Sequence, residues 1–541
     1  DAFVGPLVAR MGAQLVLPRP VRLIPDIKHL SAGAQAWIRR MASDRTVRAL
    51  AALLAIGLAL RFFILRGIWL DEATSIHQAT MPFGAMIKDL RNTDVHPPLY
   101  FSVLWATDRL FGDGALAMRI PSILAGCVAI PVAYVTGRDL WDRRTGLVAA
   151  AMASVAPILV WYSQEIRMYS MFMLFALLAL WGQARALRTN RVSDWAIYVL
   201  ASAALVWTEY FAVFQVIAQQ AVFVGVAWRR HGERARRFAV LGVATFVILA
   251  LVAPLVPFAW HQFMVNQNAG KGFGAPSQVG LAGVQSISVY TVLANLAWAV
   301  VGYHSATVMA AVVALWPVGI LLALFLLGRR MTENTVAVLG SALVPAVLLL
   351  GVGMAKRNLF DVRYMSGVVV ALLLLTARLI TGGTRDRRFQ VAACAMVIAI
   401  LSLSLGDEQV NGSNPRLYDF AGALHAVLAQ ARPGDLLMYD PGDLGLVVSY
   451  YAPRVHSTTV PAPVSERATP GSEVFVLASP NLMNGSQPSQ LGQLLSRLSG
   501  TDRAIGTIHR ANVTVWVFRV PAPSSAAAPA SAVAPSSGGR P

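Results

Sequence analysis

The chain carries seven residues, Trp69-Leu70-Asp71-Glu72-Ala73-Thr74-Ser75, just after a mostly apolar run from Leu50 to Leu65. The run is apolar enough to begin a membrane span, so it delivers the adjacent carboxylates of Asp71 and Glu72 to one membrane face. A polar loop follows that contains Asp94-Val95-His96-Pro97-Pro98-Leu99-Tyr100 before the chain re-enters the bilayer. A carboxylate near a histidine just outside a membrane can accept a proton from an incoming hydroxyl group. A lone acid would instead be interpreted as the end of a helix, but here basic residues recur on the same predicted face.

The composition is that of a membrane protein with many spans. Of 541 residues, 56% are hydrophobic and 13% are charged, whereas soluble proteins have about 25% charged residues. The formal net charge of +18 reflects arginine-rich loops on one side of the membrane and does not require nucleic acid as a partner. Both cysteines, Cys127 and Cys394, fall inside apolar runs, so neither a disulfide framework nor a metal site is supported.

Eleven segments have the apolar character of a span, which needs about 20 mostly apolar residues. With the N-terminus inside, every inside turn is rich in arginine, as the positive-inside rule demands. This agreement is lost if one span is added or removed, so the apolar segment 286–302 is predicted to lie at the outer surface as a helix. The predicted spans lie near residues 47–65, 117–137, 145–161, 168–186, 194–208, 210–228, 238–258, 305–328, 335–354, 364–381 and 389–405.

The predicted organisation has four parts. A basic extension at 1–46 lies inside, and a membrane domain at 47–405 follows, with a long first outer loop at 66–116. A small α/β domain at 406–520 is expected outside the membrane, and an Ala, Pro and Ser-rich tail at 521–541 is expected to be disordered.

Shorter elements are predicted from hydrophobic periodicity. The first outer loop mixes apolar and polar residues at helical spacing, which favours helices in the interface plane at 76–90 and 98–111. The α/β domain shows helical and strand patterns in alternation. They predict helices at 416–431 and 491–498, strands at 436–439 and 473–478, and a closing strand pair at 507–509 and 513–520.

Ionisable residues gather at the predicted outer face, and at membrane depth such residues indicate function because they are costly to place there. Carboxylates suit a general base, and arginine can hold a phosphate through two parallel hydrogen bonds. Together they predict transfer from a phosphate leaving group to a hydroxyl or amine, and the apolar surroundings favour a lipid-borne phosphate. The residues are Asp71, Glu72, His77, Asp94, His96, Arg119, Tyr162, Gln164, Glu165, Arg167, Tyr169, Glu209, Lys356, Arg357, Arg363 and Tyr364.

Several of these residues have simpler interpretations. Arg119, at the start of a span, is typical of an interfacial anchor, and Tyr162 and Tyr169 are typical of an aromatic belt. Lys356 and Arg357 could equally be ligands or anchors. The sequence has no Gly-x-x-x-x-Gly-Lys-Ser/Thr loop and no Asp-x-Asp pair, so neither ATP use nor a metal-bound nucleotide sugar is indicated.

A series of motifs resembles those of a known superfamily. It contains Trp-Leu-Asp-Glu-Ala at 69–73, Asp-Val-His-Pro-Pro-Leu-Tyr at 94–100, Arg-Ile-Pro-Ser at 119–122, Tyr-Ser-Gln-Glu-Ile-Arg-Met-Tyr at 162–169 and Asp-Val-Arg-Tyr at 361–364. Over about residues 60–405 the chain resembles the GT-C membrane glycosyltransferases of the protein O-mannosyltransferase and aminoarabinose-transferase kind. Within that superfamily it is similar to glycosyltransferase family 39.

The resemblance implies a GT-C fold and an inverting transferase that uses a polyprenyl-phosphate sugar at the outer membrane face. Asp71 matches the catalytic carboxylate, and histidine at position 96 favours the mannosyltransferase side. Glu209 stands where many relatives have histidine, which leaves its role open. The candidate catalytic residues are Asp71, Glu72 and Asp94. The candidate ligands of the donor phosphate are His96, Arg167, Lys356 and Arg363. The candidate substrate-binding residues are Tyr162, Gln164, Glu165, Glu209 and Tyr364.

The protein is expected in a bacterial plasma membrane. Its expected partners are a polyprenyl-phosphate sugar, membrane lipid and an acceptor in the cell envelope. A glycan or lipoglycan is the first acceptor, an exported protein the second, and arabinose is an alternative sugar. No cofactor is required, because cations can stabilise a monophosphate leaving group, although a divalent metal remains an alternative. A lipid or glycan transporter would instead show two repeated halves, and a non-catalytic envelope scaffold would tolerate the loss of Asp71.

Overall fold

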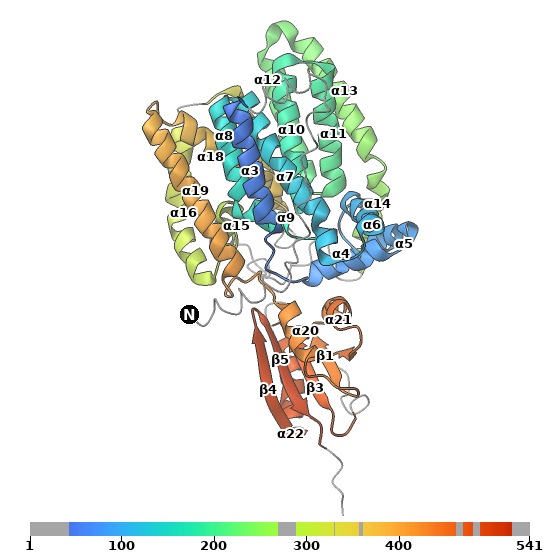
Figure 1. Ribbon diagram of the computed structural model, residues 1–541. Helices are drawn as coiled ribbons and strands as arrows, with labels where there is room; N and C mark the ends of the chain where they lie inside the picture. The colour runs from blue at the N-terminus through green and yellow to red at the C-terminus, as the bar shows by residue number, and fades with distance from the viewer. Residues whose placement is uncertain are drawn as a thin grey trace, which may run out of the picture. The chain divides into compact units, whose positions relative to one another are not determined.

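The computed structural model describes residues 43–268, 288–328, 331–355, 361–460, 469–479, 487–501 and 503–521. A long series of helices is followed by a five-stranded sheet with its own helices (Figure 1). The prediction of a polytopic helical protein with a small C-terminal α/β region is therefore confirmed. Residues 1–42 of the predicted extension and 522–541 of the predicted tail lie outside the described ranges.

Within these ranges, six helices are long and apolar enough to cross a membrane, or up to eight spans if each of two bent pairs counts as one. The bent pairs are α8 (Arg143–Val155) with α9 (Pro157–Ser163) and α15 (Val289–Val301) with α16 (Ala306–Gly328). The six are α7 (Ala115–Leu140), α10 (Tyr169–Thr189), α12 (Ala212–Arg229), α13 (Arg234–Val252), α17 (Glu333–Ala355) and α19 (Arg387–Val410). The helices α3 (Arg45–Phe62), α11 (Val192–Thr208) and α18 (Ser366–Gly382) complete the predicted set.

All eleven predicted spans are helical over most of their length, but prolines break two of them. The predicted span at 145–161 bends by 55° at Ala156, which is extended because the following Pro157 disfavours helical backbone before it. The predicted span at 238–258 is interrupted near Pro254, between α13 and α14 (Leu255–Asn268), although Ala253 before this proline keeps helical backbone angles. Since several helices are short or broken, the number of eleven crossings remains a prediction.

The first outer loop forms three helices, α4 (Leu70–Thr80), α5 (Phe83–Thr93) and α6 (Leu99–Phe111). The prediction of one helix over 76–90 is wrong, because the chain is extended at Met81 and Pro82, between α4 and α5. The helix predicted at 98–111 is confirmed. From α14, Gln262 donates from its amide to the carbonyl oxygens of Leu90, at 2.8 Å, and His96, at 3.1 Å, which ties the end of this loop in place.

The sheet has the strand order β2-β1-β3-β5-β4, with parallel pairing of β1 to β2 and β3 and antiparallel pairing of β5 to β3 and β4. Its strands are β1 (Leu436–Asp440), β2 (His456–Thr459), β3 (Glu473–Ala478), β4 (Arg503–Arg510) and β5 (Val513–Arg519). Side chains on both faces of β1 and β3 are buried, and α22 (Gln487–Thr501) packs on one face. Burial on both faces explains why these strands are mostly apolar, with a charged residue only at one end of each.

The strands predicted at 436–439 and 473–478 and the closing pair are confirmed. The helix predicted at 416–431 is shorter, α20 (Phe420–Leu428), because the Asp419 carboxylate caps it by accepting from the Gly422 N–H. The polar edge strand β2 and the helix α21 (Gly445–Tyr451) were not predicted from the sequence. Both are short, and β2 has the sequence His-Ser-Thr-Thr, which lacks an apolar pattern.

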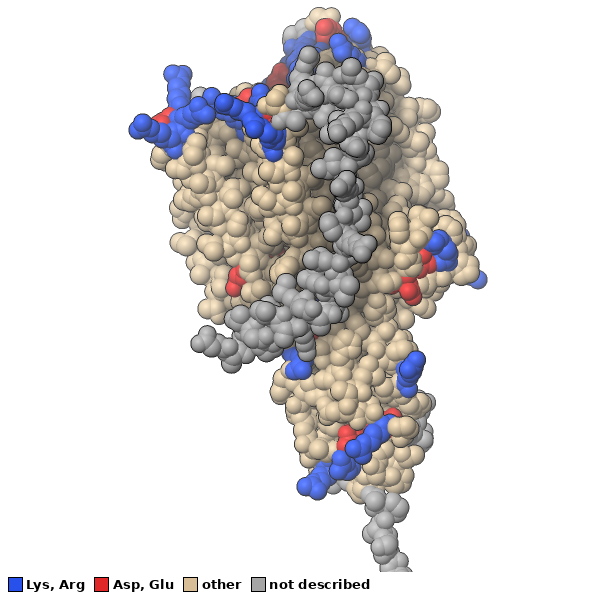
Figure 2. All heavy atoms as spheres, viewed as in Figure 1, with Lys and Arg blue, Asp and Glu red and all other residues tan. Residues whose placement is uncertain are grey.

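The chain packs as two units, residues 1–52 and residues 53–541. Within the second unit, the C-terminal region contacts the segment before α4. The Tyr451 hydroxyl accepts from the Ile68 N–H at 2.5 Å, and the Trp69 ring stacks on Tyr418 with 6.1 Å between centroids. Figure 2 shows Lys and Arg side chains gathered at the upper end of the membrane helices, with an almost uncharged belt below them. The side of the membrane on which this end lies remains a prediction.

A buried arginine, Arg61, joins α3 to α8 and α9. Its guanidinium donates to the Ser163 hydroxyl at 3.1 Å and to three backbone carbonyls, including that of Ala153 at 3.0 Å. The side chains of Arg61 and Ser163 can lie close to α7 because Gly126 of α7 has no side chain. A Cβ added there would lie 1.9 Å from Ser163 Oγ and 2.7 Å from Arg61 Nε.

We therefore expect Gly126→Ala to destabilise the protein, by about 1–3 kcal/mol as for other overpacked sites. Thermal unfolding of the purified protein in detergent measures the effect. The matched control is Gly225→Ala in α12, where no atom lies within 4 Å of the added Cβ and helix propensity alone should act. Equal unfolding temperatures for the two variants would contradict the packing argument.

Candidate active site

Asp71 lies in the first turn of α4 and contacts a guanidinium from a distant part of the chain. Arg363 Nη1 donates to Asp71 Oδ2 at 3.3 Å, and Arg363 lies in the turn before α18. Arg363 Nε also lies 3.6 Å from Asp361 Oδ1, and Asp361 Oδ2 accepts from Arg416 Nη2 at 3.1 Å. The Asp71 side chain is 26% exposed and the Arg363 side chain only 7%. The carboxylate is therefore open to an incoming molecule, while the guanidinium is enclosed.

Glu72, the next residue, is fully buried and has both carboxylate oxygens occupied. Glu72 Oε1 accepts from Arg119 Nη2 at 3.1 Å and from the Ile166 N–H at 3.0 Å. Glu72 Oε2 accepts from the Trp69 N–H at 3.2 Å, which completes a capping box at the start of α4. We propose that Glu72 positions α4, in place of the catalytic role predicted from the sequence. Arg119 is 4% exposed and paired, so the prediction of a simple interfacial anchor is wrong.

Asp94, His96 and Arg167 form a second buried group beside the same helix. His96 Nδ1 lies 2.6 Å from Asp94 Oδ1, and Arg167 Nη2 lies 3.3 Å from His96 Nδ1. Arg167 Nη1 donates to the Ser75 hydroxyl at 3.2 Å, one helical turn after Asp71. Burial raises the pKa of the Asp94 carboxyl, but the charges of His96 and Arg167 and the His96 hydrogen bond outweigh it and hold that pKa well below its usual range. The two hydrogen bonds from His96, one from its backbone N–H and one at Nδ1, hold the His96 ring against Asp94 Oδ1.

A small polar pocket lies behind Asp71. Its lining includes three guanidinium groups and one carboxylate, from Arg66, Arg363, Arg416 and Glu165, together with Trp69, Trp161, Tyr162 and Tyr303. Among the described residues, Arg66 Nε, Arg416 Nε and two nitrogens of Arg363, Nε and Nη2, have no hydrogen-bond partner. A buried donor without a partner costs about 1–3 kcal/mol, so the pocket is suited to an anion. The space is about 10 Å³, which fits one phosphate oxygen or one water molecule.

A larger cavity, of about 530 Å³, opens on the other side of Asp71. Side chains from α4 and α5 form one wall, and the segment between β1 and α21 forms the other. Four carboxylates line it, those of Asp71, Asp89, Asp94 and Asp443. A cavity of this size accommodates a small organic molecule or part of a glycan.

The predicted substrate-binding residues occupy several different environments. The Tyr162 hydroxyl lies 2.8 Å from that of Tyr303, and Glu165 Oε1 accepts from the Trp69 indole N–H at 3.0 Å. The Gln164 amide donates to the carbonyl oxygens of Leu60 and Phe63, so it fastens the end of α3.

The last two predicted substrate-binding residues lie near the ends of helices. The Tyr364 ring packs on Phe211 with 4.9 Å between centroids. Glu209 follows α11 and is buried, which raises the pKa of its carboxyl. Lys356 and Arg357 lie outside the described residues.

Three residues that line the polar pocket were not predicted from the sequence, namely Arg66, Arg416 and Tyr303. Arg66 follows an apolar run and precedes the motif at 69–73, which is a usable signal. Arg416 follows the last membrane helix and has no motif around it. In the described part of the chain, no group of three or more His, Cys, Asp or Glu side chains is placed to hold a metal ion.

Comparison with known proteins supports the architecture. Residues 95–258 match the family described as dolichyl-phosphate-mannose-protein mannosyltransferase. ArnT from Cupriavidus metallidurans bound to undecaprenyl phosphate has a TM-score of 0.53 and 13% identity, covering 90% of this chain and 98% of that chain. The apo state of the same protein gives a TM-score of 0.50 with 12% identity and the same coverage. The chain has the GT-C fold. The comparison with curated proteins finds no match.

The ion pair of Glu72 and Arg119 can be tested through stability. Arg119→Met removes one partner and leaves the Glu72 carboxylate buried without its counter-charge, which typically costs about 3–5 kcal/mol. The double variant Glu72→Gln/Arg119→Met has no lone charge and should recover part of the loss. Thermal unfolding in detergent is the measurement. The pair of Arg237 and Glu233 provides the control, since the Glu233 side chain is 55% exposed and Glu233→Gln should change stability little. A double variant no more stable than Arg119→Met would contradict this account.

Proposed function

We propose that this protein is an inverting glycosyltransferase that moves mannose from a polyprenyl-phosphate donor to a cell-envelope glycan or lipoglycan outside the cell. The observation that carries the proposal is the open Asp71 carboxylate, which lies between a cavity of about 530 Å³ and a buried, arginine-lined pocket. A base with an acceptor space on one side and an anion site on the other fits group transfer from a phosphate.

In the proposed reaction, Asp71 accepts the proton of the acceptor hydroxyl as its oxygen attacks the anomeric carbon of the sugar. The bond from that carbon to the phosphate oxygen breaks, and its electron pair leaves with the phosphate. Attack opposite the leaving group inverts the anomeric configuration.

The leaving phosphate gains negative charge. Arg363 could receive it, because its Nη1 contacts Asp71 and its Nη2 has no hydrogen-bond partner among the described residues. The Asp71 to Arg363 contact is long, at 3.3 Å, so a phosphate oxygen could replace it. Arg66 and Arg416 would add positive charge behind Arg363, and Arg167 would contribute from the other side of Asp71. This arrangement stabilises a monophosphate with side chains of the protein alone.

Three observations support the choice of donor and sugar. The ArnT structure with this fold is named as bound to undecaprenyl phosphate, and the family matched at 95–258 is named for dolichyl-phosphate mannose. The histidine at position 96 favours the mannosyl side of the resemblance. An exported protein as acceptor, or arabinose as the sugar, is the second candidate within the same reaction class.

Incubation of the purified protein with polyprenyl-phosphate mannose, and separately with polyprenyl-phosphate arabinose, tests the function. Release or transfer of mannose is the expected result. Transfer of arabinose alone would show that the transferred sugar is arabinose and not mannose. Transfer from a soluble nucleotide sugar, without a lipid intermediate, would reject the proposed donor, and absence of transfer from every donor would favour a transporter or scaffold.

Asp71→Asn keeps the shape of the side chain and removes the charge that makes it a base. Since general-base catalysis contributes roughly 10²–10⁴-fold, mannose transfer should fall by about that factor while donor binding persists. Asp113→Asn, in the same loop but outside the cavity, is the matched control and should transfer at the parent rate. If Asp71→Asn retains the parent rate, Asp71 is not the base.

Arg363→Gln should mainly impair binding of the donor phosphate. Loss of a desolvated charge partner costs about 2–5 kcal/mol, so the dissociation constant for polyprenyl phosphate should rise at least tenfold. Binding can be followed by the thermal shift that the lipid phosphate produces. Arg109→Gln, an arginine exposed on α6, serves as the control. Unchanged donor binding in Arg363→Gln would remove Arg363 from the phosphate site.

A further inference from the structure

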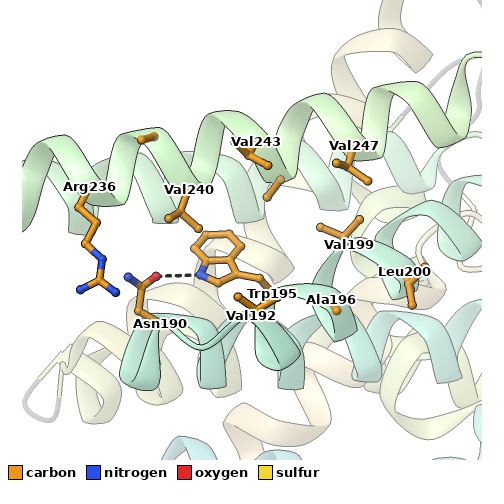
Figure 3. Close-up of a pocket in the computed structure, with 12 residues that line it drawn as sticks. Asn190, Val192, Trp195, Ala196, Val199, Leu200, Arg236, Val240, Val243 and Val247 are labelled. Atoms are coloured by element: carbon orange, nitrogen blue, oxygen red, sulfur yellow. Dashed lines mark hydrogen bonds between the residues drawn. The ribbon is translucent and has the colours of Figure 1, made fainter.

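An apolar groove runs between α11 and α13 at the arginine-rich end of the membrane helices (Figure 3). It has a volume of about 590 Å³. The residues that line it are Asn190, Val192, Trp195, Ala196, Val199, Leu200, Arg236, Ala239, Val240, Val243, Ala244 and Val247. Ten of these twelve side chains are apolar, so the occupant must have a long apolar part.

The groove walls are open, whereas its floor is closed. Val243 of α13 is 64% exposed and Leu200 of α11 is 62% exposed, but Trp195 between them is only 7% exposed. The Trp195 ring is packed against Phe223 of α12, with 4.6 Å between centroids, and cannot swing out to fill the space. Because α13 is a membrane helix, the exposed walls of the groove are in contact with membrane lipid.

The two polar side chains that line the groove, those of Asn190 and Arg236, lie at the same end of it (Figure 3). The Trp195 indole N–H donates to Asn190 Oδ1 at 2.8 Å. An indole nitrogen can only donate, so this contact fixes the amide orientation and leaves the Asn190 Nδ2 hydrogens directed elsewhere. No hydrogen bond of Asn190 Nδ2 to another described residue is observed. The end of the groove therefore offers an amide donor to an external acceptor.

Arg236 provides a positive charge at the same end. The neighbouring arginines already have partners, since Arg237 forms an ion pair with Glu233 and Arg234 donates to the Trp228 carbonyl. Arg236 is exposed, and within the described ranges it makes no side-chain hydrogen bond and no ion pair of 4.0 Å or less. In Figure 3 its guanidinium points across the end of the groove toward Asn190.

We propose that this groove binds an anionic phospholipid of the membrane leaflet at the arginine-rich end. One acyl chain lies between α11 and α13 against Trp195 and Val243. The lipid phosphate accepts from the Arg236 guanidinium and the Asn190 amide. Basic pockets between membrane helices commonly bind anionic headgroups in this way, whereas a zwitterionic headgroup would bring its own cation next to Arg236.

The groove does not serve the proposed sugar donor. Its polar end lies at the start of α11, and Glu209 follows the other end of the same helix. Seventeen residues of helix separate them, or about 25 Å at 1.5 Å per residue. A phosphate bound to Arg236 is therefore remote from Glu209 and the proposed catalytic end of the helices, so the lipid bound here is not the proposed sugar donor.

Native mass spectrometry of the delipidated protein in detergent, titrated with phosphatidylglycerol or phosphatidylcholine, tests the proposal. The parent protein should bind phosphatidylglycerol more tightly than phosphatidylcholine. Arg236→Gln should weaken phosphatidylglycerol binding about fivefold and remove the preference, since one arginine near a lipid surface contributes about that factor. Arg385→Gln, exposed in another arginine-rich turn, is the control and should bind as the parent does.

A second variant, Val243→Trp, tests the groove itself, because its ring fills the space for an acyl chain. It should lose binding of both lipids while its unfolding temperature without added lipid stays near that of the parent. Equal binding of the two lipids by the parent would overturn the proposal, as would full retention of the preference in Arg236→Gln. Undiminished binding by Val243→Trp would place the lipid elsewhere.

Discussion

The buried carboxylate of Glu72 is the interaction on which the site depends. It joins the start of α4 to Arg119 of α7 and to the Ile166 N–H in the segment between α9 and α10. A charge at this depth is tolerated because both carboxylate oxygens accept hydrogen bonds and one donor is the guanidinium of Arg119. This bond network fixes the rotation of α4 about its axis, and the rotation decides what the neighbouring Asp71 faces.

With α4 fixed, Asp71 and Ser75 meet different partners. Asp71 contacts Arg363, while Ser75, one turn later, receives Arg167. The guanidinium groups come from segments nearly 200 residues apart, and both are enclosed more tightly than the carboxylate between them. The uneven exposure separates the roles that we propose, since an open base can meet an acceptor while enclosed arginines can strengthen charge interactions with a phosphate.

The two phosphate sites that we propose would therefore differ in their chemistry. Near Asp71, several guanidinium nitrogens lack partners inside a pocket with little free space, which suits a charge that develops during a reaction. At the opposite end of α11, one exposed arginine meets a long apolar groove, which suits a lipid at equilibrium. The C-terminal region belongs to the first environment, because Arg416 reaches Asp361 and the segment before α21 lines the cavity of Asp71.

The sequence by itself determined the helical membrane class, the helical segments and the principal strands, because hydrophobic periodicity and length are local properties of the chain. It also indicated Asp71, His96, Arg167 and Arg363 as candidates through short motifs. It could not decide which of two adjacent acids is open, since neighbours on a helix point about 100° apart and only packing sets the rotation. Nor could it pair Asp71 with Arg363, 292 residues away, or bring Arg416 to Asp361. Those contacts join segments that are distant in sequence, so only the tertiary structure decided them.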